Sequence, residues 1–111
     1  MSILRLNSVE HGAIDSRFIQ AFDLELCNLG SEGFEMLITV YTPQGLLYRG
    51  LYHLAQGISV IIPRITTQFS PFQLIMVTNI NKYDTTAVTV RAWNGVHPVA
   101  IFTQEEAVRF H

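Results

Sequence analysis

The side chains that most often perform catalysis or bind metals are few in this chain and lie far apart. Zinc requires three or four converging ligands, and none of the histidines has a partner at the i,i+2 or i,i+4 spacing that would bring two imidazoles together. The four histidines are His11, His53, His97 and His111. We therefore expect no metal site and interpret each histidine as a structural or surface residue.

The carboxylates, serines and glycines form no catalytic pattern either. Glu105 and Glu106 are adjacent, and neighbours in an extended segment point to opposite faces, whereas the two carboxylates of a glycosidase face each other across a cleft. No serine lies in a G-x-S-x-G motif. Gly30 and Gly33 fall in a turn that no predicted helix follows, so they cannot cradle a phosphate. The sequence predicts no catalytic residue and no cofactor, and we expect a protein that is not an enzyme.

Two further residue types could serve binding. The single cysteine, Cys27, excludes a disulfide within the chain; a small apolar side chain in a strand is the ordinary interpretation, and a disulfide between copies or a reactive thiol is the alternative. Exposed aromatic side chains could form a platform for sugar rings, and the candidates are Tyr41, Tyr48, Tyr52, Tyr83 and Trp93. Each lies in or beside an apolar alternating run, which favours packing in a core or an interface.

These residues must be positioned by strands, because apolar residues recur at every second position along most of the chain. The clearest alternating runs are residues 18–29, 34–42, 58–62 and 86–93. Residues 46–54 alternate poorly, which predicts a bulge or a strand covered on both faces. Pro63 is expected to end its strand, since it has no N–H for the ladder, and Asn94-Gly95 predicts a type I′ hairpin turn. Eight or nine strands predict an all-β chain, an antiparallel β-sandwich or jelly roll.

Composition limits the class of partner. The chain has 111 residues, of which 49% are hydrophobic and only 14% charged, against about 25% charged in ordinary domains. So few charges indicate an apolar surface presented to a partner. A net charge of −2 and a single lysine argue against nucleic acid as a partner. We find no apolar run long enough to span a membrane and no secretory signal, and therefore expect synthesis in the cytoplasm and no membrane insertion.

The first strand-like segment, residues 3–9, is separated from the next strand by a polar segment. Leu4 and Leu6 share one face of it. A tether of about eight residues can span about 25 Å, so the two leucines can lie on the sheet of their own domain or on that of the next copy. We expect the second, with an N-terminal arm and tether at residues 1–17 and a β-sandwich domain at residues 18–111. The expected subunit interface consists of Ile3, Leu4, Leu6 and Val9.

In outline the chain resembles the small jelly-roll subunits that build fibres on bacterial spores, the endospore appendage group. The features that carry the resemblance are the extension at residues 3–9, the alternating strands at residues 18–29 and 86–93, and the length without a secretion signal. In that family an N-terminal connector links neighbouring subunits and often bears cysteines that cross-link the fibre. The arm of this chain has none, so the resemblance implies a non-covalent variant.

The sequence and the resemblance together predict a structural subunit. We expect it to form a homopolymer, an extracellular or spore-surface fibre, by donor-strand addition of the arm to a neighbouring sheet and by lateral packing. Further copies of the chain are the expected partner, with an anchoring protein on a spore or cell surface as a second one. The alternative is a carbohydrate-binding module or a viral capsid-like jelly roll, which would close into a shell.

Overall fold

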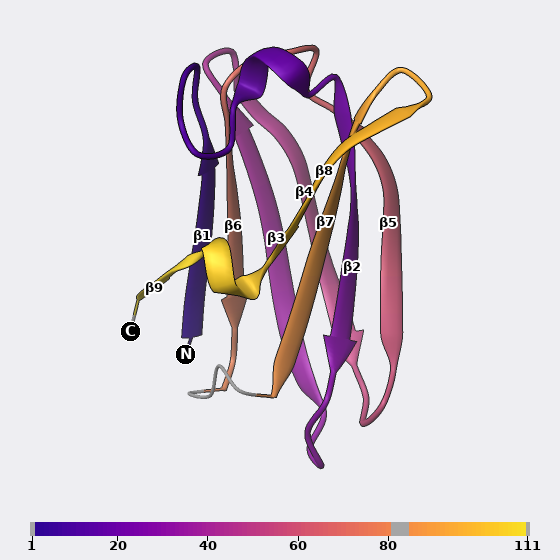
Figure 1. Ribbon diagram of the computed structural model, residues 1–111. Coiled ribbons are helices and arrows are strands. Elements are labelled where there is room, and N and C mark those ends of the chain that lie inside the picture. Colours follow the sequence, from indigo (N-terminus) through magenta and orange to yellow (C-terminus); the bar gives the residue numbers. More distant parts are fainter. Residues whose placement is uncertain (1, 81–84, 111) are drawn as a thin grey trace.

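Two antiparallel sheets pack against each other in the computed structural model, which describes residues 2–80 and 85–110 (Figure 1). The five-stranded sheet has the order β4 (Gly45–Leu54), β3 (Phe34–Thr42), β6 (Phe72–Thr78), β1 (Ser2–Ser8), β9 (Val108–Phe110). The four-stranded sheet has the order β5 (Ser59–Thr66), β2 (Ala21–Asn28), β7 (Thr86–Asn94), β8 (His97–Thr103). Two single turns of 3-10 helix complete the described elements, η1 (Ser16–Phe18) and η2 (Gln104–Glu106). The predicted all-β sandwich is confirmed.

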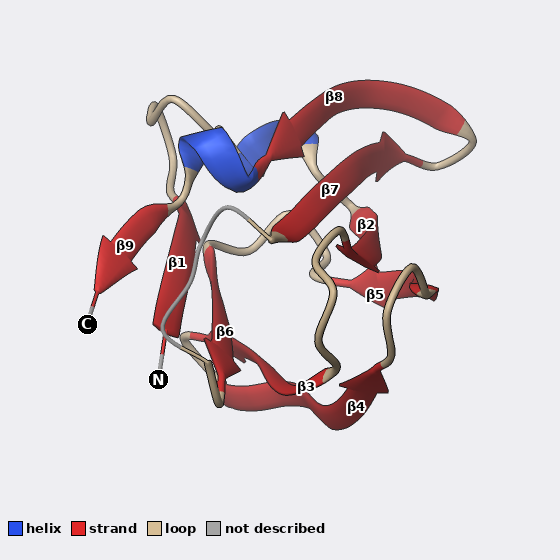
Figure 2. Cartoon of the chain, turned by 90° about the horizontal axis from the view of Figure 1, so that it is seen from below, coloured by secondary structure: helices blue, strands red, loops and turns tan. Residues whose placement is uncertain are grey.

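The core lies between the two sheets because each inner strand turns every second side chain inward. In β7 this alternation is unbroken for the first seven residues, and in β6 it covers the whole strand. Phe22 of the four-stranded sheet stacks on Phe72 of the five-stranded sheet with ring centroids 5.0 Å apart. Figure 2 shows the two layers from one end, with β9 turned outward beside β1. None of the described helices has the length and hydropathy of a membrane-spanning segment.

The first strand lies in a different place from the one we expected. Instead of forming an arm at residues 1–17 outside a domain at residues 18–111, β1 pairs with β6 on one side and β9 on the other within its own chain. Leu4 and Leu6 are 2% and 0% exposed and belong to the common core. The physical reason is that β6 would otherwise present an unpaired edge above a core that lacks two leucines.

The segment after β1 folds back compactly and does not extend as a tether. The Val9 N–H donates to the Ile14 carbonyl over 3.2 Å, and the Ser16 N–H donates to the Val9 carbonyl over 3.3 Å. Asp15 caps η1 and pairs with the guanidinium of Arg17 at 2.7 Å, which lowers the pKa of that carboxyl to about 2. The loop is therefore held by local contacts in the conformation that returns the chain to the four-stranded sheet.

Three local predictions also differ from the structure. Phe18 lies in η1 and is 54% exposed, because β2 begins only at Ala21. Pro63 does not end its strand: β5 is an edge strand, so the missing N–H interrupts no ladder, and a register shift occurs opposite this point. At the β7–β8 turn only Gly95 has a positive φ, of 63°, whereas Asn94 ends β7, so the turn is not the predicted type I′.

The irregular pattern of residues 46–54 is explained by two tyrosines that meet above a glycine. Tyr48 and Tyr52 point from β4 to the same side, and their hydroxyls are hydrogen-bonded. A Cβ atom at Gly50, between them, would lie 2.8 Å from a ring carbon of Tyr52 and 3.0 Å from the Tyr48 hydroxyl. Burial and the Tyr48 hydroxyl raise the pKa of Tyr52 to about 12. A register shift between β3 and β4 at Val40 and Tyr41 supplies the predicted bulge.

Burial of β1 in its own core predicts the effect of shortening its inward side chains. Leu6→Ala should lower the free energy of unfolding by about 2–5 kcal/mol, because it leaves a cavity in a closed core. Asn7→Ala, on the adjacent exposed residue, should change it by less than about 0.5 kcal/mol. Urea denaturation of the two variants and the unchanged chain measures both. Equal midpoints for the two variants would show that Leu6 is not part of this core.

The tyrosine pair predicts a second outcome. Gly50→Ala should separate Tyr48 from Tyr52, and the pKa of Tyr52 should fall from about 12 toward the ordinary tyrosine value of 10.0. Ultraviolet absorbance during an alkaline titration records the change. Gly33→Ala is the matched control, because its Cβ would approach no atom closer than 3.5 Å. An unchanged titration in Gly50→Ala would contradict the contact.

Candidate functional site

The four residues expected at a subunit interface do not share one surface. Leu4 and Leu6 point into the core, while Ile3 lies half-buried on the outer face of the five-stranded sheet. Val9 follows the end of β1 and is 51% exposed. Of these residues, only Ile3 and Val9 are in a position to contact another molecule without opening the sandwich.

Ile3 belongs to an unbroken line of aliphatic side chains across the outer face of the five-stranded sheet. The strand register pairs Leu51 with Leu37, Leu37 with Val77, and Val77 with Ile3. Side chains of directly paired residues lie on the same face of a sheet. We call the four residues Ile3, Leu37, Leu51 and Val77 the apolar row. Leu51, at the edge strand β4, is 67% exposed, and the other three are half-buried.

Charged side chains flank the apolar row, with opposite signs on its two sides. On one side of the row, two residues along β3 and β4, lie Glu35 and His53, which are paired in the strand register. Nδ1 of His53 lies 2.8 Å from Oε1 of Glu35. On the other side of the row, two residues from Leu51 along β4, lies Arg49, which is paired with Thr39 of β3. The Arg49 guanidinium makes a 3.4 Å contact with the Tyr41 hydroxyl. On β3 and β4 the outer face is thus acidic beyond one side of the row and basic beyond the other.

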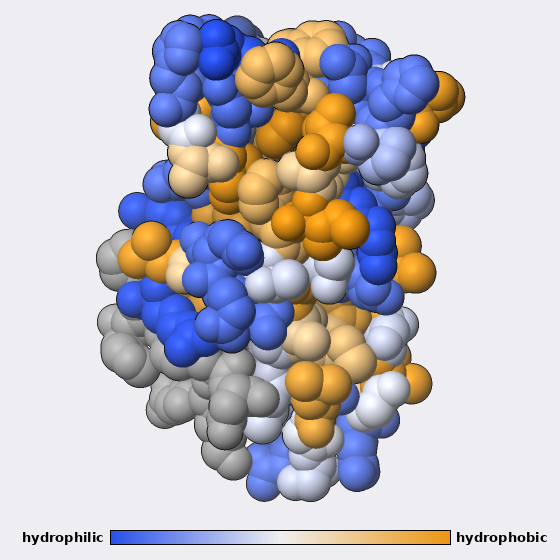
Figure 3. All heavy atoms as spheres, in the orientation of Figure 1, coloured by the Kyte–Doolittle hydropathy of each residue, from blue (hydrophilic) through white to orange (hydrophobic). Residues whose placement is uncertain are grey.

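A second apolar surface surrounds β8, on the side of the molecule that Figure 3 displays. Exposed aliphatic and aromatic side chains gather there over two adjoining grooves of about 390 and 590 Å³ that share Ala13 and Phe102 in their lining. We call the following residues the β8 surface: Val9, Phe18, Val99, Ile101 and Val108. Each of them is at least 41% exposed.

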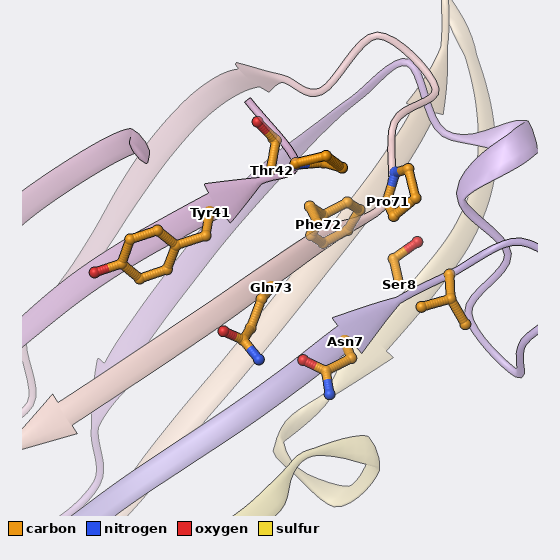
Figure 4. A pocket seen from close by; sticks show the side chains of 9 residues that line it. Asn7, Ser8, Tyr41, Thr42, Pro71, Phe72 and Gln73 are labelled. Carbon is orange, nitrogen blue, oxygen red and sulfur yellow. The ribbon is translucent and has the colours of Figure 1, made fainter. Parts of the chain in front are cut away.

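A pocket of about 370 Å³ lies where β6 begins, between the ends of β1 and β3 (Figure 4). Asn7 and Gln73 are paired across β1 and β6, and their amide groups reach the same side of the sheet. Neither amide makes a hydrogen bond within the described part of the chain. Tyr41, Pro71 and Phe72 supply rings to the lining. The pocket can therefore offer two amides and apolar ring surface to a neutral polar molecule.

A buried hydroxyl lies beside this pocket, on the opposite face of the sheet from the two amides. Ser8 lines it, is 1% exposed, and its Oγ has no hydrogen-bond partner in the described residues. An unpaired buried hydroxyl is costly unless something supplies a partner. Sequence reasoning missed this site, because Asn7, Gln73 and Tyr41 come from three segments that only the strand register brings together.

Most of the aromatic residues considered for a sugar platform have other contacts. Tyr48 and Tyr52 pack against the core, and Tyr83 lies outside the described residues. The indole N–H of Trp93 donates to Asp23 over 2.9 Å, and the guanidinium of Arg64 lies 5.2 Å from the indole ring centre. Tyr41, which is 36% exposed, lines the pocket where β6 begins.

The described histidines and carboxylates meet in pairs, as Glu35 and His53 do, and not in larger groups that could hold a metal ion. Among the described residues no group of three or more His, Cys, Asp or Glu side chains could hold a metal ion. Glu106 closes a capping box with Thr103 at the start of η2, which lowers the pKa of its carboxyl, and Glu105 lies 3.9 Å from Arg109. Cys27 is half-buried on the outer face of the four-stranded sheet, between Ser59 and Ala87.

Comparison with known proteins supports the fold and goes no further. No protein-family model matches the chain, and no curated protein does. The crystal structure of Thermotoga maritima 1070 is similar, with a TM-score of 0.51 and 13% sequence identity. The match covers 75% of this chain and 72% of the Thermotoga maritima chain. At this identity the similarity concerns the arrangement of the sheets alone.

Proposed function

We propose that this chain is a structural subunit that assembles with copies of itself through the outer face of its five-stranded sheet. The observation that carries the proposal is the apolar row, which crosses four neighbouring strands without a polar side chain. The outer face of an antiparallel sheet is ordinarily polar where it meets water. Sheets that pack face to face bury such rows against each other at about 10 Å.

A second apolar surface favours an open assembly over a single closed pair. The β8 surface lies at β8, β9 and the loop after β1, beyond the β1 end of the apolar row, so a subunit in contact through that row still presents an apolar surface elsewhere. Repeated use of two different contacts builds a filament when the rotation does not close. β1 stays in its own sheet in this scheme, which replaces donor-strand addition by contact between faces.

The resemblance to endospore appendage subunits supports a location for this filament. It would lie on a spore surface or outside the cell, held by an anchoring protein. Closed shells in place of filaments would instead support the viral capsid-like alternative. Both architectures follow from the same contacts with different rotations between subunits.

Leu51 provides the direct test. Leu51→Lys should raise the dissociation constant for self-association roughly tenfold or more, since it removes the burial of a leucine worth about 1.5–3 kcal/mol from each copy. Light scattering after size-exclusion chromatography, with negative-stain microscopy, measures the assembly. Ile61→Lys is the matched control, because Ile61 is 62% exposed on the edge strand of the other sheet. A chain that remains monomeric at high concentration would contradict the proposed function.

A second candidate function, carbohydrate binding, is favoured by the pocket of Figure 4. Amide side chains can donate and accept hydrogen bonds at once, which suits neighbouring hydroxyls of a neutral sugar. The ring of Tyr41 offers an apolar face beside them.

The pocket residues predict the outcome of a binding experiment. Saturation-transfer NMR with a panel of neutral mono- and disaccharides should detect binding to the unchanged chain and a loss of the signal in the double variant Asn7→Ala with Gln73→Ala. Gln56→Ala, an exposed amide in the turn between β4 and β5, is the control and should bind normally. Absence of signal from the whole panel, or equal signals in all three proteins, would exclude this candidate.

A further inference from the structure

The charges beside the apolar row distinguish between the ways in which two copies can meet. Glu35 is the only acidic residue in β3 and Arg49 the only arginine or lysine in β4. They lie on opposite sides of the row, each two residues from it along its strand. Two residues of a strand span about 6.6 Å, so each charge lies about that far from the row.

A two-fold axis that runs along the apolar row makes this pattern self-complementary. Rotation by 180° about that axis places the row of one copy on the row of the other. The acidic side of each copy then faces the basic side of its partner. Arg49 of one copy falls opposite His53 of the other, which is the direct register neighbour of Glu35. Neighbouring strands are about 4.8 Å apart, a distance that an arginine side chain can cross.

The contact between Glu35 and His53 supports this alignment. Oε1 of Glu35 lies 2.8 Å from Nδ1 of His53, so the carboxylate leans toward β4. In the two-fold arrangement, Arg49 of the second copy lies opposite this strand. The Glu35 side chain is 44% exposed and retains a second oxygen. A guanidinium can approach that oxygen without breaking the contact to the imidazole.

We infer that the occupant of this face is a second copy of the chain, related by a two-fold axis along the apolar row, with Glu35 of each copy paired to Arg49 of the other. The inference rests on the proposed function and gives it a geometry. The apolar row supplies the burial, and the two symmetric ion pairs determine the relative orientation. A two-fold axis parallel to the strands would also place the two faces together. It would bring the acidic side of one copy against the acidic side of the other, and the basic side against the basic side.

Charge reversal with mixing of variants tests the geometry. Glu35→Arg alone and Arg49→Glu alone should each weaken self-association roughly tenfold or more, because two attractive pairs become repulsive. An equimolar mixture of the two variants should restore association, since a mixed pair again places an arginine opposite a glutamate at both positions. Differently tagged copies and a pull-down identify the mixed pair, and added salt should weaken its recovery. Glu32→Arg, in the exposed turn between β2 and β3, is the matched control and should leave association unchanged.

The outcomes separate this geometry from the proposed function. Recovery in the mixture, together with unchanged thermal unfolding of each variant, supports the two-fold contact. Self-association of the unchanged chain that neither reversal weakens overturns the geometry while the proposed function stands. Weakening without recovery in the mixture overturns the pairing of Glu35 with Arg49. A chain that never self-associates overturns both.

Discussion

The pairing of β1 with β6 is the constraint on which both the core and the surface depend. Its inward residues, Leu4 and Leu6, are almost fully buried, and each contributes about 1.5–3 kcal/mol by leaving water. Its outward residue Ile3 continues the line that Leu37 and Val77 begin on the neighbouring strands. The same strand also provides the edge on which β9 lies. One seven-residue element therefore closes the sandwich and completes the face that we assign to assembly.

The sequence predicts the strands of this fold much better than their neighbours in space. The alternation of Phe34–Thr42 identifies β3 because burial on one face imposes a period of two. The residues of β1 do not indicate which sheet it joins, because a short tether can reach a sheet in the same chain or in another copy. Likewise Leu37 and Val77 are recognisable as outward-facing, but only long-range register brings them into line. The pocket at Asn7 and Gln73 is invisible in the sequence for the same reason.

On the outer face of the five-stranded sheet, the low charge content lets a few charges determine how two copies are oriented. Apolar burial is proportional to area and has no direction, so an apolar row could pair with another in several orientations. A few charges beside the row penalise the orientations that oppose like signs. Glu35 and Arg49 can do this because β3 and β4 carry so few other charges on that side. In a more highly charged sheet a single pair would have little influence on orientation.

The edges of the two sheets give a reason why assembly would use faces instead of added strands. An exposed edge invites another strand, and proteins oppose this with prolines, bulges and short edge strands. Here β5 contains Pro63 and β8 contains Pro98, β9 has only three residues, and β4 is paired to β3 through a register shift. Each described edge thus carries one of these features. The apolar row, in contrast, lies on a face against which a second sheet can pack, and donor-strand addition would have to work against the features of each described edge.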